Sequence, residues 1–504
     1  MFSFNLIERP WIPCLTKTGQ AQELSLRDVF LQSPRLATIQ GETPPETVAL
    51  YRLLLAILHR NFETRTSEQW RKLRDMGEFD TAKLNVYLDK WLHRFDLFGH
   101  ERPFYQSDDD RANPKSVVSL LLHMVSGANA VLFDHHTEQE GATLTPGQAA
   151  RAVLTAQAFA VGGLSGMDEK FTDAPCAKGV LFLAMGDSLF ETLLFNLVRY
   201  YDTDPMPNDE DDMPAWEMKD PFKKRLQPKG YIDYLTWHNR RILLLPEETS
   251  GGAIVVRQMK WAPGLRLEAE EIDPMKRYLR DKNKKQAPRV LQFSASRALW
   301  RDCDTLFVLD NPDYIKPPAV FRHLANLTRQ RIVPYDKTLR FMALGMAKDR
   351  AKLEFFRAET LPLPLKYLQD NQFVVNLIEQ LHIATETSGK LYGALTTLAR
   401  FILSPNADQS GGREPDPKDI TNLRTTWDAE GFFWSGLERP FHELLITLPD
   451  TPEEARAAWR EALERRVRQA FDRAVQGVSN SPRAYKAIAQ AETQLDKGLK
   501  EIFK

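Results

Sequence analysis

The most constraining feature of the sequence is a change of periodicity near residue 360. Thr360–Leu365 (TLPLPL) carries two prolines, and the chain after it has the pattern of helix almost throughout. Thr451-Pro452-Glu453-Glu454 has the pattern of a capping box with proline at the first helical position, and apolar residues then recur at steps of three and four. Helical segments at 373–403, 419–445, 451–478 and 481–503, with short connections, predict an antiparallel four-helix bundle. We expect a kink at Pro440.

The chain before this change mixes strand and helix patterns. Phe2–Pro13 predicts an opening strand, Glu46–Phe62 a strongly amphipathic helix, and Arg240–Leu245 and Ala253–Trp261 β-structure. The predicted fold class is therefore α+β. A large mixed α/β N-terminal domain over residues 1–365 precedes a C-terminal four-helix bundle over residues 366–504.

Charge and cysteine content limit the partners and the compartment. The net charge of −1 means that a polyanion must be met by a local basic patch. Three cysteines stand far apart with no CxxC pair, which argues against a cysteine zinc site and is typical of a reducing cytosol. The N-terminus has no signal-peptide pattern and no apolar stretch is long enough to span a bilayer, so we expect a cytoplasmic protein without a membrane partner.

Motifs of common catalytic sites are absent from the sequence. It contains no GxxxxGK[ST], no GxGxxG opening a helix, no HExxH and no GxSxG. One alternative is a metal-dependent nuclease or hydrolase that uses His135, His136 and Glu138, although adjacent histidines point in different directions on regular backbone. A second possible function is a helical scaffold protein that does not contact nucleic acid. We expect no enzymatic activity, no cofactor and no bound metal.

The stretch Phe133–Lys170 is the clearest candidate for a binding element. It comprises a polar loop (Phe133–Thr143), a helix (Pro146–Phe159) that Thr145 caps, and a glycine turn with Gly162 and Gly163. Adjacent glycines allow the backbone to approach another chain or a nucleic acid closely. A helix with a glycine cap followed by an ordinary loop is the alternative.

Two basic clusters lie farther along the chain. Lys276–Arg301 holds nine cations against one anion, which suits either phosphate contact or an exposed, solvated loop. Lys337–Arg357 is the second cluster. Its apolar run before Gly345 and its polar residues from Lys348 to Arg350 predict a strand that leads to a short loop with a cationic tip.

Five segments in order resemble the CasA family, the large subunit of the type I-E CRISPR surveillance complex called Cascade. They are Phe4-Asn5-Leu6 with Pro10-Trp11-Ile12-Pro13, LFDHH (Leu132–His136), LTPGQAARAVLTAQAFAVGG (Leu144–Gly163), LTWHNRRILLL (Leu235–Leu245) and ALWRD (Ala298–Asp302).

The resemblance implies a non-catalytic subunit that recognises the protospacer-adjacent motif in double-stranded DNA, mainly from the minor groove. It implies that the subunit helps to open the duplex, holds the displaced strand and recruits a helicase-nuclease. The implied partners are the other Cascade subunits, the 5′ end of the guide RNA, and the target duplex with its displaced strand. In such systems the guide reads the sequence, and the protein reads a short motif and the backbone shape.

The resemblance also assigns residues. The family's glycine loop corresponds to Gly162 and Gly163, where a Cβ would keep the backbone away from the base edges. Its assembly and recognition loop corresponds to Phe133–Thr143, with Phe133 at the base. Its duplex-splitting wedge corresponds to the tip that includes Lys348, Arg350, Ala351 and Lys352, where other members often have a polar amide. Its lysine finger falls near Lys276. Some members bind zinc through paired cysteines, which this chain lacks.

Overall fold

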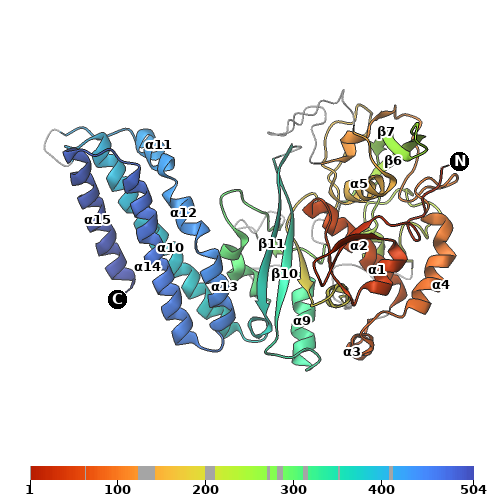
Figure 1. Cartoon of the computed structure of the whole chain (residues 1–504), viewed down its shortest axis with the longest axis horizontal. Coiled ribbons are helices and arrows are strands. Elements are labelled where there is room, and N and C mark those ends of the chain that lie inside the picture. Colours follow the sequence, from red (N-terminus) through yellow and green to blue (C-terminus); the bar gives the residue numbers. More distant parts are fainter. Residues whose placement is uncertain are drawn as a thin grey trace. The chain divides into compact units, whose positions relative to one another are not determined.

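The computed structural model describes residues 2–62, 64–122, 142–198, 211–268, 273–280, 288–309, 316–349, 352–407 and 412–503. Helices alternate with small antiparallel sheets before residue 365, and helices follow it, which confirms the predicted mixed α+β class (Figure 1). Phe133 and the His135, His136 and Glu138 cluster lie outside the described residues, as do Arg350 and Ala351.

The described residues form two compact units. Unit 1 contains Met1–Ser294, Leu309–Tyr335 and Leu339–Thr360, and unit 2 contains Ala295–Val308, Asp336–Thr338 and Leu361–Lys504. Unit 2 thus includes two short segments that precede residue 365, which a single cut between 365 and 366 assigns to the N-terminal domain. That domain division stays a prediction.

Unit 1 is built around two helices that pack against each other, α2 (Pro44–Asn61) and α5 (Pro146–Phe159). The Thr145 side chain caps α5 by accepting a hydrogen bond from the Gln148 amide, and Pro146 occupies the first position, as the sequence predicts. The expectation of an amphipathic α2 is wrong. Both faces of α2 are buried, and Arg52 and His59 lie inside with the leucines, because α2 is the central helix of the unit.

Smaller elements complete unit 1. Its other helices are α1 (Leu26–Gln32), α3 (Ser67–Met76), α4 (Thr81–Trp91), α6 (Leu189–Asn196), α7 (Tyr231–Leu235) and α9 (Ala319–Arg329), with 3-10 turns η1 (Leu92–Arg94) and η2 (Val117–Leu120). Its strands are β1 (Ile12–Thr16), β2 (Ala21–Leu24), β3 (Leu36–Ile39), β4 (Lys115–Ser116), β5 (Leu181–Met185), β6 (Arg240–Glu248), β7 (Ile254–Pro263), β8 (Tyr278–Leu279) and β9 (Arg289–Val290).

A long hairpin joins the last strands of the chain. β10 (Thr338–Asp349) pairs antiparallel with β5 and is the middle strand of the sheet β11-β10-β5, whose other edge is β11 (Lys352–Pro364). Gly345 lies in β10, where a Cβ would stand 2.9 Å from the carbonyl oxygen of Gly179, so the sheet packs closely only with glycine there. The hairpin confirms that a strand precedes the polar residues beginning at Lys348.

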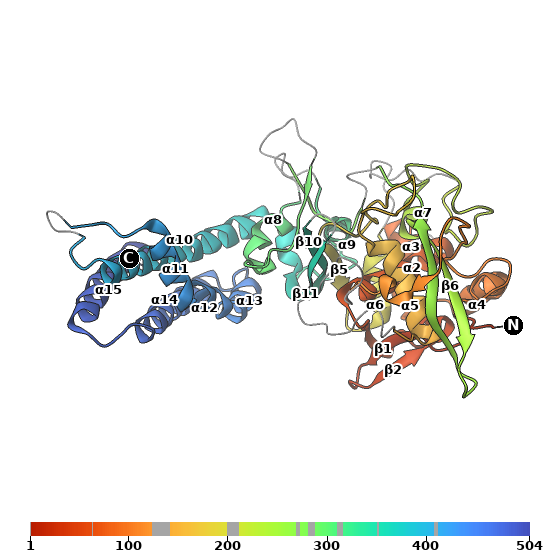
Figure 2. The same ribbon diagram turned by 90° about the horizontal axis from the view of Figure 1, so that it is seen from above.

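Unit 2 is the predicted helical bundle. Three of the four helical positions in the bundle, which we call columns, are occupied by α10 (Asn371–Leu403), α14 (Pro452–Gln476) and α15 (Pro482–Ile502). The fourth column is divided into α11 (Pro417–Trp427), α12 (Ala429–Ser435) and α13 (Glu438–Thr447), and η3 (Leu299–Asp302), α8 (Cys303–Phe307) and η4 (Leu365–Leu368) complete the unit. The long α10 packs against α11, α14 and α15 and so forms the spine of the bundle (Figure 2).

The expected kink at Pro440 is wrong, and α10 is one unbroken helix. Asp428 breaks the fourth column in the left-handed conformation, at φ 46°, and a second break falls at Gly436 and Leu437. Pro440 lies in the first turn of α13, where a missing N–H costs no intrahelical hydrogen bond. Within the described ranges, no helix has the length and apolar character needed to cross a membrane.

Candidate nucleic-acid interface

The glycine turn is one end of a closed loop that follows α5. We call Val161–Thr172 the glycine loop. Gly163 and Phe171 pair across its base through hydrogen bonds of 3.1 Å and 3.0 Å, and the Ala174 amide donates to the Ala160 carbonyl at 2.8 Å. The two arms are therefore fixed by backbone pairing, and the residues between them project from a rigid base.

A buried arginine connects the two arms at the base of the glycine loop. Arg240, at the start of β6, is 0 % exposed and donates to the carbonyl oxygens of Val161 (3.0 Å) and Thr172 (2.8 Å), one on each arm. Its guanidinium lies 4.7 Å from the centre of the Phe171 ring. Burial lowers the pKa of Arg240 to about 9. Gln157 of α5 fixes the Arg240 backbone by accepting from its amide (2.9 Å) and donating to its carbonyl (2.8 Å).

Gly162 lies so close to the opposite arm of the glycine loop that a larger residue would crowd its backbone. A Cβ at this position would lie 3.1 Å from both the Asp173 nitrogen and the Phe171 oxygen, so the opposite arm would have to move. From the sequence, this glycine was explained by close approach to another chain or a nucleic acid, or by a glycine cap at the end of the helix. The neighbouring Leu164 is 87 % exposed, and sequence reasoning missed this apolar tip.

The Asp173 carboxylate connects the glycine loop to the β10–β11 hairpin. Its Oδ1 accepts hydrogen bonds from the Gly162 amide at 2.8 Å and from the Lys348 ammonium at 2.6 Å, while its Oδ2 pairs with Lys178 at 3.2 Å. Partial burial raises the pKa of Asp173, but Lys348, the Gly162 N–H and Lys178 outweigh it, so the net pKa is lowered. The carboxylate is therefore ionised at neutral pH.

These groups surround an open depression of about 580 Å³, lined in part by Gly162, Thr172, Asp173, Lys178 and Lys348. Two of the segments predicted from the sequence, the glycine loop and the hairpin, thus meet in unit 1. Lys352 is exposed on the second strand of the hairpin. Asp173 and Lys178 were missed, because nothing in the sequence between Phe171 and Lys178 marks them as partners of Lys348.

Lys276, the predicted lysine finger, is directed into unit 1. Its side chain is 7 % exposed, and its ammonium donates to the Pro175 carbonyl at 2.6 Å and lies 3.5 Å from the Asp273 carboxylate. Asp273 also accepts a hydrogen bond from the Tyr234 hydroxyl at 2.8 Å. A contact between Lys276 and DNA therefore requires that its ammonium leave this buried cluster.

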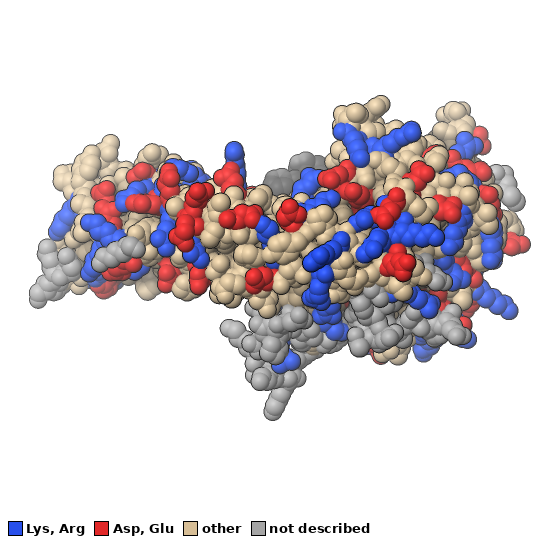
Figure 3. Space-filling model, turned by 90° about the horizontal axis from the view of Figure 1, so that it is seen from below, with Lys and Arg blue, Asp and Glu red and all other residues tan. Residues whose placement is uncertain are grey.

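A second hollow, of about 730 Å³, is also lined by the glycine loop and shares Thr172 with the depression. We call it the basic groove. Six cations line it against three carboxylates: Arg111, Lys170, Lys224, Arg225, Arg241 and Arg266 against Asp168, Glu169 and Glu268. Arg241 lies 4.3 Å from the centre of the Phe222 ring. Arg225 pairs with the buried Asp233, and Arg111 and Arg241 both lie near Asp109, so the net surplus of positive charge is small. This surplus suits an anionic backbone. Basic and acidic side chains are intermingled over much of the face in Figure 3.

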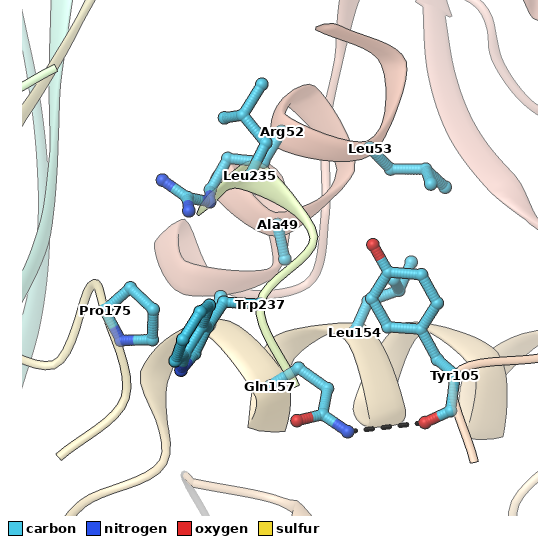
Figure 4. Close-up of a pocket in the computed structure, with 10 residues that line it drawn as sticks. Ala49, Arg52, Leu53, Tyr105, Leu154, Gln157, Pro175, Leu235 and Trp237 are labelled. Atoms are coloured by element: carbon cyan, nitrogen blue, oxygen red, sulfur yellow. Dashed lines mark hydrogen bonds between the residues drawn. The ribbon is translucent and has the colours of Figure 1, made fainter. Parts of the chain in front are cut away.

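One cavity is enclosed between α2, α5 and the segment after α7 (Figure 4). Its volume is about 10 Å³, enough for a single water molecule. Arg52, Trp237 and Gln157 line it, and Gln157 donates to the Tyr105 carbonyl at 3.3 Å. The cavity is too small for a cofactor. Within the described ranges, no group of three or more His, Cys, Asp or Glu side chains is placed to hold a metal ion.

Comparison with known proteins defines first a class: the chain is a CRISPR-associated protein. The family model described as CRISPR-associated protein Cse1 matches residues 5–470. The CRISPR-associated protein CasA/Cse1 of Thermus thermophilus is 33 % identical over 517 residues, with 99 % of this chain and 98 % of the relative covered. The chain therefore belongs to the CRISPR-associated protein Cse1 family.

Solved structures agree with this assignment. A crystal structure of CasA from Thermus thermophilus superposes with a TM-score of 0.81 at 29 % identity, covering 99 % of this chain and 100 % of that one. A chain of a structure titled CRISPR RNA-guided surveillance complex has the same fold, with a TM-score of 0.72 at 21 % identity and coverage of 98 % and 99 %. The resemblance stated from the sequence is confirmed.

Proposed function

We propose that the chain is a non-catalytic subunit of an RNA-guided CRISPR surveillance complex and recognises a short motif in duplex DNA through its glycine loop. Family membership supports the role as a subunit. The observation that carries the DNA contact is the depression in which the glycine loop, the hairpin and two lysines converge. A rigid, glycine-based loop beside cations suits the minor groove, which admits backbone closely and offers a degenerate code.

The neighbouring surfaces fit the same assignment. The basic groove supplies cations for the phosphates of the flanking duplex. Lys348 lies near the end of β10 and Lys352 begins β11, and we assign the wedge that opens the duplex to this part of the chain. Exposed Leu164 offers an apolar group of the kind that minor-groove proteins insert between base steps. Contact of the Phe133 loop with the guide RNA 5′ end, retention of the displaced strand and recruitment of a helicase-nuclease belong to the same proposal.

The test is reconstitution with the other complex subunits and guide RNA, followed by binding to duplexes that differ only in the flanking motif. Gly163→Asp places a carboxylate at the base of the loop, and we expect on the order of tenfold weaker binding to motif-bearing duplex with intact guide-RNA assembly. Arg350→Ala tests the wedge assignment in the same way. Gly251→Asp is the matched control, because Gly251 is exposed in the β6–β7 turn and a Cβ there meets only Thr249 at 3.9 Å. Binding that ignores the flanking motif in the unsubstituted complex contradicts the proposal.

A further inference from the structure

The two lysines in the depression are arranged around one anion. Lys348 binds Oδ1 of Asp173 at 2.6 Å and Lys178 pairs with Oδ2 at 3.2 Å, so each cation holds a different oxygen. The Gly162 N–H adds a third donor at 2.8 Å. Two positive charges and a backbone N–H therefore face a single carboxylate, which leaves one positive charge in excess.

A phosphodiester needs the same kind of partners as this carboxylate, namely positive charge and hydrogen-bond donors. It carries one negative charge on two non-bridging oxygens, and lysine ammonium groups and backbone N–H groups are its common donors. The Lys348 side chain is only 8 % exposed, so its ammonium is held at the floor of the depression, whereas Lys178 is 60 % exposed and can follow a ligand at the mouth. The depression, at about 580 Å³, has room for a backbone phosphate.

We propose that Lys178 and Lys348 form a phosphodiester-binding site in the depression, and that the Asp173 carboxylate occupies this site until nucleic acid displaces it. The proposal rests on the proposed function, because it places a DNA phosphate beside the glycine loop. It assigns roles to Asp173 and Lys178, which neither the sequence nor the family resemblance marked.

The arrangement also couples two parts of the interface. Asp173 accepts hydrogen bonds from both the Gly162 amide and Lys348. When a phosphate binds Lys348, the carboxylate loses that partner and keeps only its hydrogen bond to the glycine loop. In the free chain the carboxylate offsets part of the positive charge, which reduces attachment to duplexes that lack the correct motif. Asp173 is thus a positioning residue that sets how much of the binding depends on the motif.

Asp173→Asn tests the proposal in the assembled complex. The amide oxygen still accepts from the Gly162 N–H, but the competing charge is gone. We expect binding to duplex without the motif to strengthen on the order of tenfold at low salt. Adding Lys178→Ala to Asp173→Asn should reverse this gain and reduce the slope of log affinity against log salt by about 0.9, the value for one lost phosphate contact. Lys17→Ala, an exposed lysine in the β1–β2 turn, is the matched control.

The outcomes separate the two proposals. If the unsubstituted complex discriminates between motifs but Asp173→Asn and Lys178→Ala leave affinity and salt slope unchanged, the phosphate site is refuted and the proposed function stands. If the unsubstituted complex does not discriminate between motifs, the proposed function is refuted, and the phosphodiester-binding site that rests on it is refuted with it. Should Asp173→Asn prevent assembly, Lys178→Ala alone decides, because its exposed side chain contributes little to folding: an unchanged salt slope refutes the site, and a slope reduced by about 0.9 supports it.

Discussion

Replacing Arg240 with methionine should loosen the base of the glycine loop without unfolding the protein. The substitution removes the hydrogen bonds to the Val161 and Thr172 carbonyls and the contact with the Phe171 ring. A hydrogen bond to a charged group contributes about 1.5–3 kcal/mol and a buried cation–π contact about 1 kcal/mol, while relief from burying the charge offsets part of this. We therefore expect the free energy of opening the loop to fall by about 2–4 kcal/mol.

Hydrogen exchange followed by mass spectrometry measures this change at the right place. For the peptide that spans residues 160–174, a loss of about 2–4 kcal/mol in opening free energy corresponds to exchange about 30-fold to several hundred-fold faster. Arg257→Met, on the exposed side of β7, is the matched control and should leave this peptide unchanged. Exchange in Arg240→Met as slow as in the unsubstituted chain would refute the argument that the buried guanidinium holds the two arms together.

The described contacts support three further predictions. Asp212 accepts hydrogen bonds from the amides that start α7, and burial raises its pKa to about 6. Its contribution to stability is therefore complete below about pH 4 and is lost as the pH rises through about 6. Over that window the free energy of unfolding in urea should decline relative to that of Asp212→Asn. Lys224→Glu in the basic groove should weaken duplex binding equally for all motifs and reduce the salt slope, as gel-shift titrations at several salt concentrations would reveal. Trp300→Ala should destabilise unit 2 by about 3–5 kcal/mol, seen as a lower thermal midpoint, because its ring packs 4.7 Å from that of Phe441.

The sequence predicts those elements whose signals are local. Thr145 and Pro146 mark the start of α5, and the proline-punctuated segment marks the change to helix, because capping and periodicity act over a few residues. The breaks in the fourth column of the bundle were missed. Asp428 adopts a left-handed conformation that aspartate tolerates better than most residues but seldom takes, and only the packing selects it at this position.

The candidate site was predicted only in part, because its contacts join residues that are far apart in the sequence. Gly162 and Lys348 were singled out by local patterns and given roles by the family resemblance. The residues that join them, Asp173 and Arg240, act over separations of 175 and 79 residues. The basic groove draws its cations from Arg111 to Arg266, so no sequence window contains the cluster. Long-range convergence of this kind follows from tertiary packing, which periodicity and composition do not encode.

The passage of Ala295–Val308 into unit 2 has a practical consequence for dissecting the protein. Trp300 is 1 % exposed there, next to the rings of Trp434, Phe441 and Trp459. A fragment truncated at residue 365 would keep Trp300 but lose these neighbours, and the bare aromatic surface would favour aggregation. The complementary fragment would carry a vacant slot in its core. Expressing the bundle alone therefore calls for grafting residues 295–308 onto it, so that each half keeps the side chains that complete its own interior.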